Sequence, residues 1–310
     1  MKALVFPGQG SQFVGMGREL ALAFRPAAEV FEEVDDALNQ HLSRVMFEGA
    51  DEELAMTANT QPAIMASSVA VMRVLERECG INIKNFAAYV AGHSLGEYSA
   101  LTAASSTTLR QAAKLLRIRG NAMQRAVPAG QGAMAALIGA NIPEVEAICN
   151  KAAEYGVCEI SNDNSAGQVV ISGSSDAIDR AVELAPEFGV KKAVRLNVSA
   201  PFHCELMKPA AEEMRAALEA EVFKSPEVQV IANVTADVVN KPPVIKALLV
   251  EQVTKTVRWR ESILKMKELG VNEYYEIGSG KVLAGLIKRI DKEAVITNLE
   301  TPKDIELFVK

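Results

Sequence analysis

The sequence contains few cysteines and histidines, and neither residue occurs in a pattern typical of a metal site. The four cysteines form no C-x-x-C pair and are most simply interpreted as reduced thiols; they are Cys79, Cys149, Cys158 and Cys204. The three histidines, His41, His93 and His203, show no HExxH or similar spacing. We therefore expect no catalytic metal.

The sequence also lacks an excess of basic residues and any long apolar run. Thirty-three Lys and Arg against 39 Asp and Glu give a formal net charge of −6, so no overall basic field favours nucleic acid or an anionic membrane. No apolar run approaches the roughly 18 residues of a membrane span. The first residues lack a basic segment followed by a long apolar one. We expect a cytoplasmic protein that binds neither nucleic acid nor a membrane.

The 310 residues, of which 49% are apolar, are enough for a large domain that carries a small one. Strand-like segments at 2–6 and 86–91 alternate with helical segments at 17–38, 60–79, 97–104 and 108–125. This alternation predicts an α/β domain with a parallel sheet and helices on both faces.

The pattern changes after residue 128. Strands are expected at 132–139, 157–160, 168–172 and 193–198, with helices at 143–155 and 175–188. The order βαββαβ is that of a ferredoxin-like fold. Helices at 209–220, 247–254 and 259–269 and strands at 228–232 and 273–277 then return to the first pattern. We predict a large domain of residues 1–128 and 200–310 and an inserted small domain of residues 129–199.

The most informative motif is Gly92-His-Ser-Leu-Gly96, which places Ser94 between a strand and a helix. Its two glycines let the backbone cross itself closely at a strained serine. The serine hydroxyl is then exposed, and the amide of Leu95 lies at the electropositive start of the helix. This geometry predicts that Ser94 is a nucleophile.

Ser94 needs a general base, and His203 is the best candidate. His203 lies where the small domain returns the chain to the large one, and ligand sites favour crevices between domains. The alternative is a histidine at a helix start that makes only a local hydrogen bond. Nearly everything between Ser94 and His203 belongs to the insert or to a long helix, so we favour a dyad in which a backbone carbonyl holds the imidazole. His93 adjoins Ser94 but points away in a tight turn, so we expect it to pack or to order the turn.

The segment 6–12, Phe-Pro-Gly-Gln-Gly-Ser-Gln, follows the first strand and offers donors for a developing oxyanion. The amide of Gln9, together with that of Leu95, would form an oxyanion hole. The alternative is a Gly-rich turn with a helix-capping glutamine. A phosphate loop is disfavoured because the lysine of its motif is absent.

Arg119 lies on the apolar face of the helix at 108–125, in line with Leu116 and Met123. A buried guanidinium without an anion is costly. Its partner is therefore either a protein carboxylate or the carboxylate of a ligand, and the residues alone leave both possibilities open.

Eight blocks of sequence, in order along essentially the whole chain, closely resemble the malonyl-CoA:acyl carrier protein transacylases of bacterial fatty acid synthesis. They are FPGQGSQ at 6–12, TQPA at 60–63, GHSLGEYSAL at 92–101, RG at 119–120 with MQ at 123–124, GAMAALIG at 132–139, NSAGQVVISG at 164–173, APFHCELMKPA at 200–210 and GSGKVLAGLIKRI at 278–290. The resemblance implies an α/β-hydrolase-like core with a ferredoxin-like insert.

The resemblance also implies roles for individual residues. Ser94 is the acylated nucleophile, His203 is the base, and the main-chain carbonyl of Gln252 orients His203. The amides of Gln9 and Leu95 form the oxyanion hole. On the substrate side, Arg119 pairs with the malonyl carboxylate, Asn162 lies in the loop over the acyl and pantetheine site, Phe202 matches the form found in malonyl-selective members, and His93 is grouped with the substrate-binding residues.

The implied reaction is a ping-pong transfer of malonyl from malonyl-CoA, through Ser94, to the phosphopantetheine thiol of an acidic acyl carrier protein. It needs no cofactor, and we expect a monomer. Candidate contacts for the carrier, or else plain solvated surface, are Lys191, Lys192, Lys281, Lys288 and Arg289. A serine hydrolase or thioesterase and a non-catalytic carrier-binding module are the alternatives.

Two segments depart from the family pattern. Ala166 stands where the family commonly has proline, and the segment 104–106, Ala-Ser-Ser, replaces one that usually contains glycine. We expect Ala166 to loosen the loop at 164–168, which resembles a lid over the site. We expect the change at 104–106 to alter helix packing behind the turn at Ser94.

Overall fold

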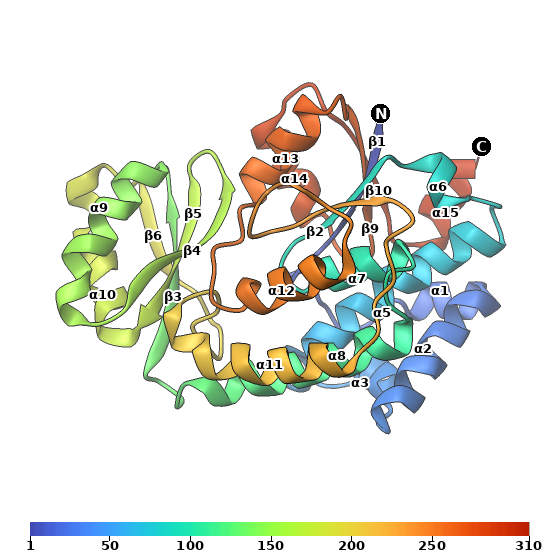
Figure 1. The fold of residues 1–310 in the computed structure, drawn as a ribbon, viewed down its shortest axis with the longest axis horizontal. Helices are drawn as coiled ribbons and strands as arrows, with labels where there is room; N and C mark the ends of the chain where they lie inside the picture. Colours follow the sequence, from blue (N-terminus) through green and yellow to red (C-terminus); the bar gives the residue numbers. More distant parts are fainter. Residues whose placement is uncertain (310) are drawn as a thin grey trace.

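The strands of the larger part of the chain form a six-stranded sheet (Figure 1), which we describe from a computed structural model of residues 1–309. Its strands are β1 (Lys2–Phe6), β2 (Tyr89–Gly92), β7 (Gln229–Ile231), β8 (Val238–Val239), β9 (Glu273–Ile277) and β10 (Val295–Leu299). The order is β10-β9-β1-β2-β7-β8, and every neighbouring pair is parallel except β7 with β8. The α/β class with a mainly parallel sheet is confirmed.

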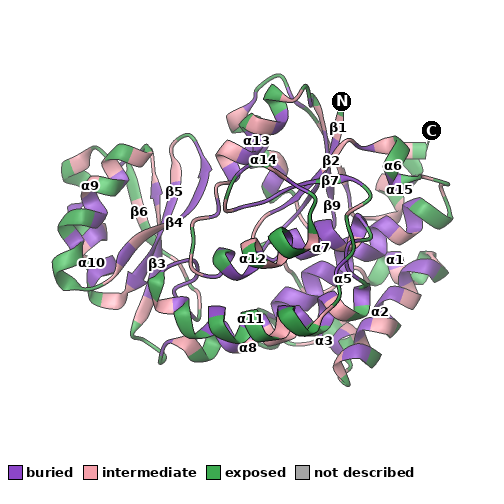
Figure 2. Ribbon diagram, in the orientation of Figure 1, coloured by how far each residue is buried: buried purple, intermediate pink, exposed green. Residues whose placement is uncertain are grey.

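Helices cover both faces of this sheet. They are α1 (Arg18–Ala23), α2 (Arg25–Leu38), α3 (Leu42–Glu48), α4 (Asp51–Ala55), α5 (Thr57–Arg77), α6 (Ile83–Phe86), α7 (Gly96–Ala103), α8 (Leu109–Ala126), α11 (Lys208–Ala220), α12 (Pro242–Gln252), α13 (Trp259–Glu268), α14 (Val282–Ile290) and α15 (Pro302–Val309). Along β1, Leu4 and Phe6 join the core under α5, whereas Ala3 and Val5 join a second core with Trp259. Both faces of β1 are therefore buried in apolar cores. Helix α5 is buried over most of its length (Figure 2).

A second, four-stranded antiparallel sheet lies at the other end of the molecule (Figure 1). It contains β3 (Gly132–Ile138), β4 (Cys158–Ser165), β5 (Gln168–Ser174) and β6 (Lys192–Arg195), with α9 (Ile142–Ala152), α10 (Ser175–Leu184) and the 3₁₀ turns η1 (Ala153–Tyr155) and η2 (Ala185–Phe188). The order β4-β5-β3-β6 is that of a ferredoxin-like fold, and its apolar residues form a core of their own. The boundaries at residues 129 and 199 stay a prediction.

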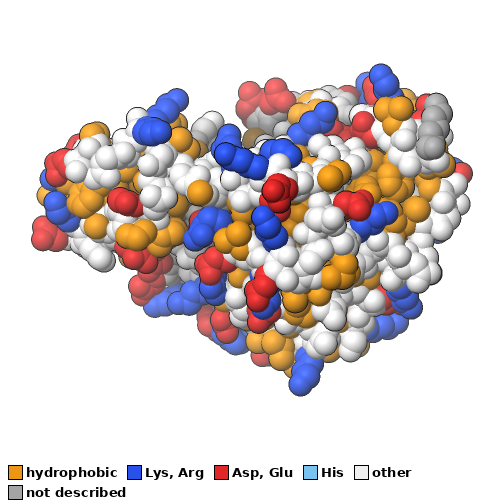
Figure 3. Space-filling view, turned by 90° about the horizontal axis from the view of Figure 1, so that it is seen from above, with side chains coloured by type: hydrophobic (Ala, Val, Ile, Leu, Met, Phe, Trp, Pro, Cys, Tyr) orange, Lys and Arg blue, Asp and Glu red, His pale blue; other side chains and the backbone are white. Residues whose placement is uncertain are grey.

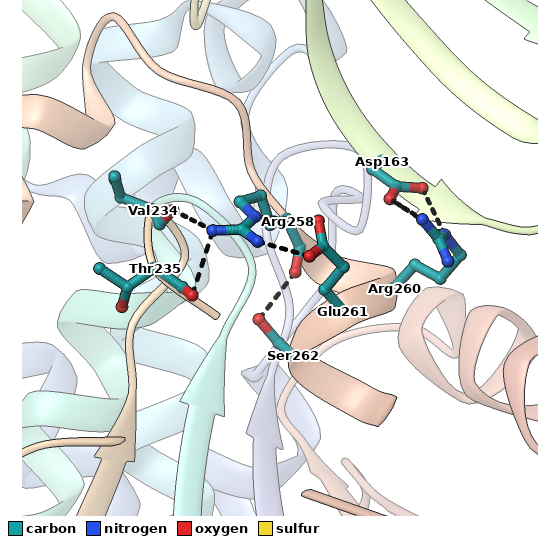
Figure 4. A network of polar contacts seen from close by, with 7 residues as sticks. All are labelled: Asp163, Val234, Thr235, Arg258, Arg260, Glu261 and Ser262. Carbon is teal, nitrogen blue, oxygen red and sulfur yellow. Dashed lines mark hydrogen bonds and ion pairs between the residues drawn. The ribbon is translucent and has the colours of Figure 1, made fainter. Parts of the chain in front are cut away.

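The two sheets are tied together where β4 meets the segment before α13. Asp163 N donates to Val257 O at 3.0 Å, and Val257 N donates to Ser161 O at 2.8 Å. Beside this bridge, Arg260 on α13 binds both carboxylate oxygens of Asp163 on β4 (Figure 4). In the same view Arg258 donates to the main-chain oxygens of Val234 and Thr235. Asn162, which was expected in a loop, lies on β4, and this strand is thus anchored to the large sheet.

Several local features differ from the pattern expected from the sequence. The strand expected at 86–91 begins only at Tyr89, because Ile83–Phe86 form the short helix α6, and the strand expected at 193–198 ends at Arg195. The single helix expected at 17–38 is two helices, because Phe24 is extended just before the Arg25-Pro26 start of α2. Proline has no N–H to continue a helix and clashes with the preceding turn. The pattern also does not anticipate the strands β8 and β10 or the helices α3, α4, α14 and α15. Ser105, in the segment where the family usually has glycine, has a φ of 57°, which glycine adopts without strain.

No helix among residues 1–309 combines the length and apolar character that crossing a membrane requires.

Gly92 lets β2 and α7 approach each other at the turn that carries Ser94. A Cβ built on Gly92 would lie 1.9 Å from the main-chain carbon and oxygen of Gly96, whereas one on Gly285 in α14 would meet no atom within 4 Å. We expect Gly92→Ala to lower the melting temperature strongly, because backbone cannot yield as a side chain does. Gly285→Ala is expected to leave it unchanged or slightly higher, since alanine favours a helix by about 1 kcal/mol. Thermal unfolding followed by circular dichroism checks both, and equal melting temperatures would contradict the close approach at residue 92.

Candidate active site

Ser94 lies at a strained turn between β2 and α7. Its φ is 54°, in the left-handed region that non-glycine residues rarely adopt. Asn233, two residues after the end of β7, holds this turn from both sides: Ser94 N donates to Asn233 Oδ1 at 2.7 Å, and Asn233 Nδ2 donates to Gly92 O at 2.7 Å. The strain at Ser94 is therefore held by hydrogen bonds to a neighbouring parallel strand end.

The imidazole of His203 is hydrogen-bonded to the hydroxyl of Ser94. The distance from Ser94 Oγ to His203 Nε2 is 2.8 Å, and that from His203 Nδ1 to the main-chain oxygen of Gln252 is 2.6 Å. A carbonyl only accepts, so Nδ1 carries the proton and Nε2 is free to accept from Ser94. His203 itself has a φ of 59°, so both members of the pair are held in the left-handed region. The residue that orients the imidazole is a main-chain carbonyl and not a carboxylate.

The imidazole of His203 is held neutral. It is 4% exposed, and burial together with the nearby charge of Arg119 lowers the pKa of His203 to about 3. At neutral pH the ring is therefore an unprotonated acceptor that is ready to take a proton from Ser94.

Arg119, on α8, is a buried cation that faces the serine. It is 1% exposed, and its NH2 donates to Ser94 Oγ at 3.1 Å and to Gln252 Oε1 at 3.0 Å, while its NH1 donates to Gln61 Oε1 at 2.8 Å. Within residues 1–309, this guanidinium forms no ion pair with a carboxylate, and its Nε has no hydrogen-bond partner. Of the two partners that the sequence left open, the protein carboxylate is absent.

Close packing of two helices brings Arg119 to this position. A Cβ on Gly120 would lie 2.7 Å from Ala58 Cα and from Thr57 O, so only glycine lets α8 lie this near to α5. Gln61 on α5 thereby reaches Arg119, and its Nε2 contacts Met123 Sδ at 3.6 Å. The arginine is fixed by amide oxygens that solvate its charge without neutralising it.

The predicted site residues gather around one cavity of about 330 Å³ between the two sheets. Eight of the nine line it: Gln9, His93, Ser94, Leu95, Arg119, Asn162, Phe202 and His203. Gln252 lies directly behind and contacts three of them through hydrogen bonds. In the described part of the chain, the main-chain N–H groups of Gln9 and Leu95 donate to no protein acceptor. Two residues that line the cavity next to the nucleophile thus each have a free main-chain donor.

The far side of the cavity comes from the small sheet. His93 Nε2 donates to Asn164 Oδ1 at 2.8 Å, and its ring packs against Trp259 with 5.6 Å between centroids. Asn162 and Asn164 lie on β4, which the bridge to Val257 holds against the large sheet. His93 therefore both packs and lines the cavity, and it ties the turn at Ser94 to the inserted domain.

The polar residues of the site that were not found from the sequence include Gln61, Glu97, Asn164 and Asn233. Amides have no diagnostic spacing, so only position offered a signal. Asn233 follows a predicted strand at the carboxyl edge of the parallel sheet, where functional groups collect. Glu97 lies in the first turn after Ser94 and is 2% exposed; its Oε2 accepts from Asn233 N at 3.1 Å and from Gln252 Nε2 at 2.8 Å.

The basic residues proposed as carrier contacts lie outside the cavity. Lys191 and Lys192 lie at the start of β6, and Lys281, Lys288 and Arg289 are exposed at or along α14. On the face seen in Figure 3, basic and acidic side chains are interspersed. No three His, Cys, Asp or Glu side chains among residues 1–309 are grouped so that they would hold a metal ion.

The comparisons with known proteins agree with one another. The acyl transferase domain model matches residues 3–295. A malonyl CoA-acyl carrier protein transacylase of Bacillus subtilis is 45% identical over 99% of this chain and 96% of its own length. The crystal structure of an acyl-carrier-protein S-malonyltransferase from Bartonella henselae superposes with a TM-score of 0.97 at 52% identity, covering 99% of this chain and 98% of that one.

A further solved structure is a malonyl-transacylase in complex with its type II PKS acyl-carrier protein, with a TM-score of 0.96 at 40% identity over 99% of this chain and 98% of that one. Family model, sequence and structure therefore lead to one assignment: this chain belongs to the acyl transferase domain family and, within it, to the malonyl CoA-acyl carrier protein transacylases.

Proposed function

We propose that this chain transfers the malonyl group of malonyl-CoA to the phosphopantetheine thiol of an acyl carrier protein, through a malonyl ester of Ser94, and so supplies fatty acid synthesis. One observation carries the proposal. The buried guanidinium of Arg119, which has no carboxylate partner among the described residues, lies 3.1 Å from the hydroxyl of Ser94, and this hydroxyl is hydrogen-bonded to the neutral imidazole of His203. The names of the relatives, and the solved complex of a malonyl-transacylase with an acyl-carrier protein, support the same substrates.

In the first half-reaction Ser94 Oγ attacks the thioester carbon while its proton passes to His203 Nε2. The negative charge on the tetrahedral oxygen is stabilised by the N–H groups of Gln9 and Leu95, and a single donor of this kind typically contributes roughly 10²–10³ in rate. The C–S bond then breaks, and the CoA sulfur takes the proton from His203. The malonyl group is left as an ester on Ser94.

The second half-reaction is the reverse with a different thiol. The phosphopantetheine thiol gives its proton to His203 and attacks the ester, and Ser94 recovers its proton as the C–O bond breaks. Throughout both halves the carbonyl of Gln252 holds Nδ1–H, which keeps the imidazole in the tautomer that the proton transfer needs.

Arg119 supplies selectivity for the acyl group. A substrate carboxylate completes the coordination of its buried charge, whereas acetyl leaves that charge unpaired. Sites built for a polar group reject analogues that lack it by about 10⁴. Phe202 and Asn162 line the same cavity and are proposed to shape the acyl and pantetheine site.

Nucleophile, base and donors account for every bond made and broken, so we propose that no cofactor is needed. The proposed steps use the nucleophile, base, cation and oxyanion donors around one cavity and require no residue of a second copy, so we propose action as a monomer. We propose the cytoplasm, where CoA thioesters and carrier proteins are available, as its location.

Intact-protein mass spectrometry after brief exposure to malonyl-CoA tests the covalent step. The wild-type protein is expected to gain one malonyl group, whereas Ser94→Ala gains none, because among residues 1–309 Ser94 is the side chain that hydrogen-bonds to His203 Nε2. A stable adduct on the alanine variant would assign the chemistry to another residue. Sustained release of free malonate without an acceptor thiol would instead favour a hydrolase, and carrier binding without any adduct would favour a non-catalytic module.

Substitution of Arg119 tests the selectivity. We expect Arg119→Ala to lower kcat/KM for malonyl-CoA by roughly 10²-fold or more, because loss of one partner of a buried charge pair costs about 2–5 kcal/mol. Transfer from acetyl-CoA is expected to fall much less. Arg125→Ala, on the same helix with an exposed ion pair to Glu213, serves as the matched control. An unchanged malonyl-to-acetyl preference in Arg119→Ala would overturn the assignment.

The pH dependence of acylation tests the state of His203. Because burial lowers its pKa to about 3, the base is unprotonated throughout the neutral range and is lost only as the pH falls toward that value. The single-turnover rate of Ser94 acylation at saturating malonyl-CoA is therefore expected to stay level from pH 8 to pH 5.5. A decline with a midpoint near the ordinary histidine value of about 6.5 would show that the base is solvated.

A further inference from the structure

Glu97 is a buried carboxylate next to the site to which the proposed chemistry assigns no step. It is 2% exposed and lies in the first turn of α7, where the helix dipole favours a negative charge. Burial nevertheless raises the pKa of Glu97 to about 7, against the opposing effects of its hydrogen bonds and of Arg119. Such a carboxylate needs a reason to be retained in a core.

Its nearest polar contact is the side-chain amide of Gln252. Gln252 Nε2 donates to Glu97 Oε2 at 2.8 Å, to Ser94 O at 3.1 Å and to Asn233 Oδ1 at 3.2 Å. On its other side, Gln252 Oε1 accepts from Arg119 NH2 at 3.0 Å. If the side-chain amide of Gln252 were flipped, its Nε2 would face Arg119 NH2, and two hydrogen-bond donors would then oppose each other. Glu97 is the charged member among the three acceptors that hold the amide in the orientation Arg119 needs.

Arg119 is the one charged group that acts on Glu97 from the elements around it. From the loop after β7 comes Asn233, and from α12 comes Gln252; both are uncharged. The other titratable neighbours of Arg119 are Tyr98, whose pKa burial raises, and His203, whose pKa burial lowers, and both are neutral in the range around pH 7. The pKa of His93 is also lowered by burial. Among these groups, Glu97 is therefore the one whose negative charge, acting on Arg119, appears or disappears near pH 7.

We propose that Glu97 is a positioning residue for the malonyl carboxylate: it fixes the amide of Gln252 with its oxygen toward Arg119, and its own charge competes with the incoming carboxylate for Arg119. This inference rests on the proposed function. Arg119 then stabilises the malonyl carboxylate by contact and the Glu97 carboxylate from a greater distance, so binding of malonyl favours the protonated form of Glu97, and protonation of Glu97 favours binding of malonyl.

The preference for malonyl-CoA over acetyl-CoA is expected to fall as the pH rises. Below the pKa of Glu97 its carboxyl is neutral and Arg119 attracts malonyl at full strength. As the pH rises through about 7, the anion forms and offsets part of that attraction. The ratio of kcat/KM for malonyl-CoA to that for acetyl-CoA is therefore expected to fall, by about fivefold, the lower end of typical coupling between two sites. Both substrates carry the same CoA, so titration of its phosphates cancels in the ratio.

The experiment measures this ratio from pH 6 to pH 8.5 in wild-type protein, Glu97→Gln, Glu97→Leu and Glu276→Gln. Glu97→Gln keeps an oxygen for Asn233 N and Gln252 Nε2 but carries no charge, so its ratio is expected to be independent of pH and to equal the low-pH value of the wild type. Glu97→Leu removes the acceptor, so its ratio is expected to drop at every pH with acetyl transfer largely retained. Glu276 is equally buried but caps α14, so Glu276→Gln is expected to behave as the wild type.

Two results would overturn the inference: a wild-type ratio that is high and level across the range, or a Glu97→Gln ratio that keeps the wild-type pH dependence. If Glu97→Leu does not fold, Glu97→Gln alone still decides whether the charge acts. Failure of the proposed function has a different signature, because the wild-type protein would then show no preference for malonyl-CoA at any pH.

Discussion

The site depends on one constraint: a full positive charge is buried beside the nucleophile without a carboxylate to neutralise it. Amide oxygens from Gln61 and Gln252 solvate Arg119, and the close packing of α5 against α8 at Gly120 brings them within reach. The same charge acts on its neighbours. It favours the neutral form of His203 and opposes the rise in the pKa of Glu97 that burial causes. Burial is the larger cause of both pKa shifts, and the position of this one side chain adds to the first and opposes the second.

Backbone strain at the site is supported by the network that orients its side chains. Ser94 and His203 both have a positive φ, and residues of this kind cost of order 1–3 kcal/mol each. Asn233 bonds the two sides of the turn at Ser94, and Gln252 bonds both the carbonyl of Ser94 and the ring of His203. The Gln252 amide also donates to Asn233 Oδ1 and to Glu97, and Glu97 accepts from the main-chain N–H of Asn233 as well. The two strained positions are therefore held by one connected network.

What the sequence predicted well was local or periodic. The alternation of strands and helices predicted an α/β core with a ferredoxin-like insert, and the motif around Ser94 predicted the strand, turn and helix found there. The role of the Gln252 carbonyl came only through the resemblance, because a main-chain acceptor has no sequence signature. For Asn233 the sequence offered only its place after a predicted strand, because its contact with Ser94 depends on the pairing of β2 with β7. Gln61 could not be found because its contact with Arg119 depends on the approach of α5 to α8. The break at Phe24 was missed although Pro26 signals it.

The use of a carbonyl in place of a third, acidic member of a triad is connected with the charge of Arg119. A carboxylate at the position of the Gln252 oxygen would lie near the guanidinium and would offset the charge available to a substrate. The carbonyl fixes the same tautomer of His203 at 2.6 Å without adding a charge, and the side chain of the same residue bonds Arg119. One glutamine thus serves the base through its main chain and the cation through its side chain. Orientation of the base and selection of a carboxylate are compatible in this site because the group that holds His203 is neutral.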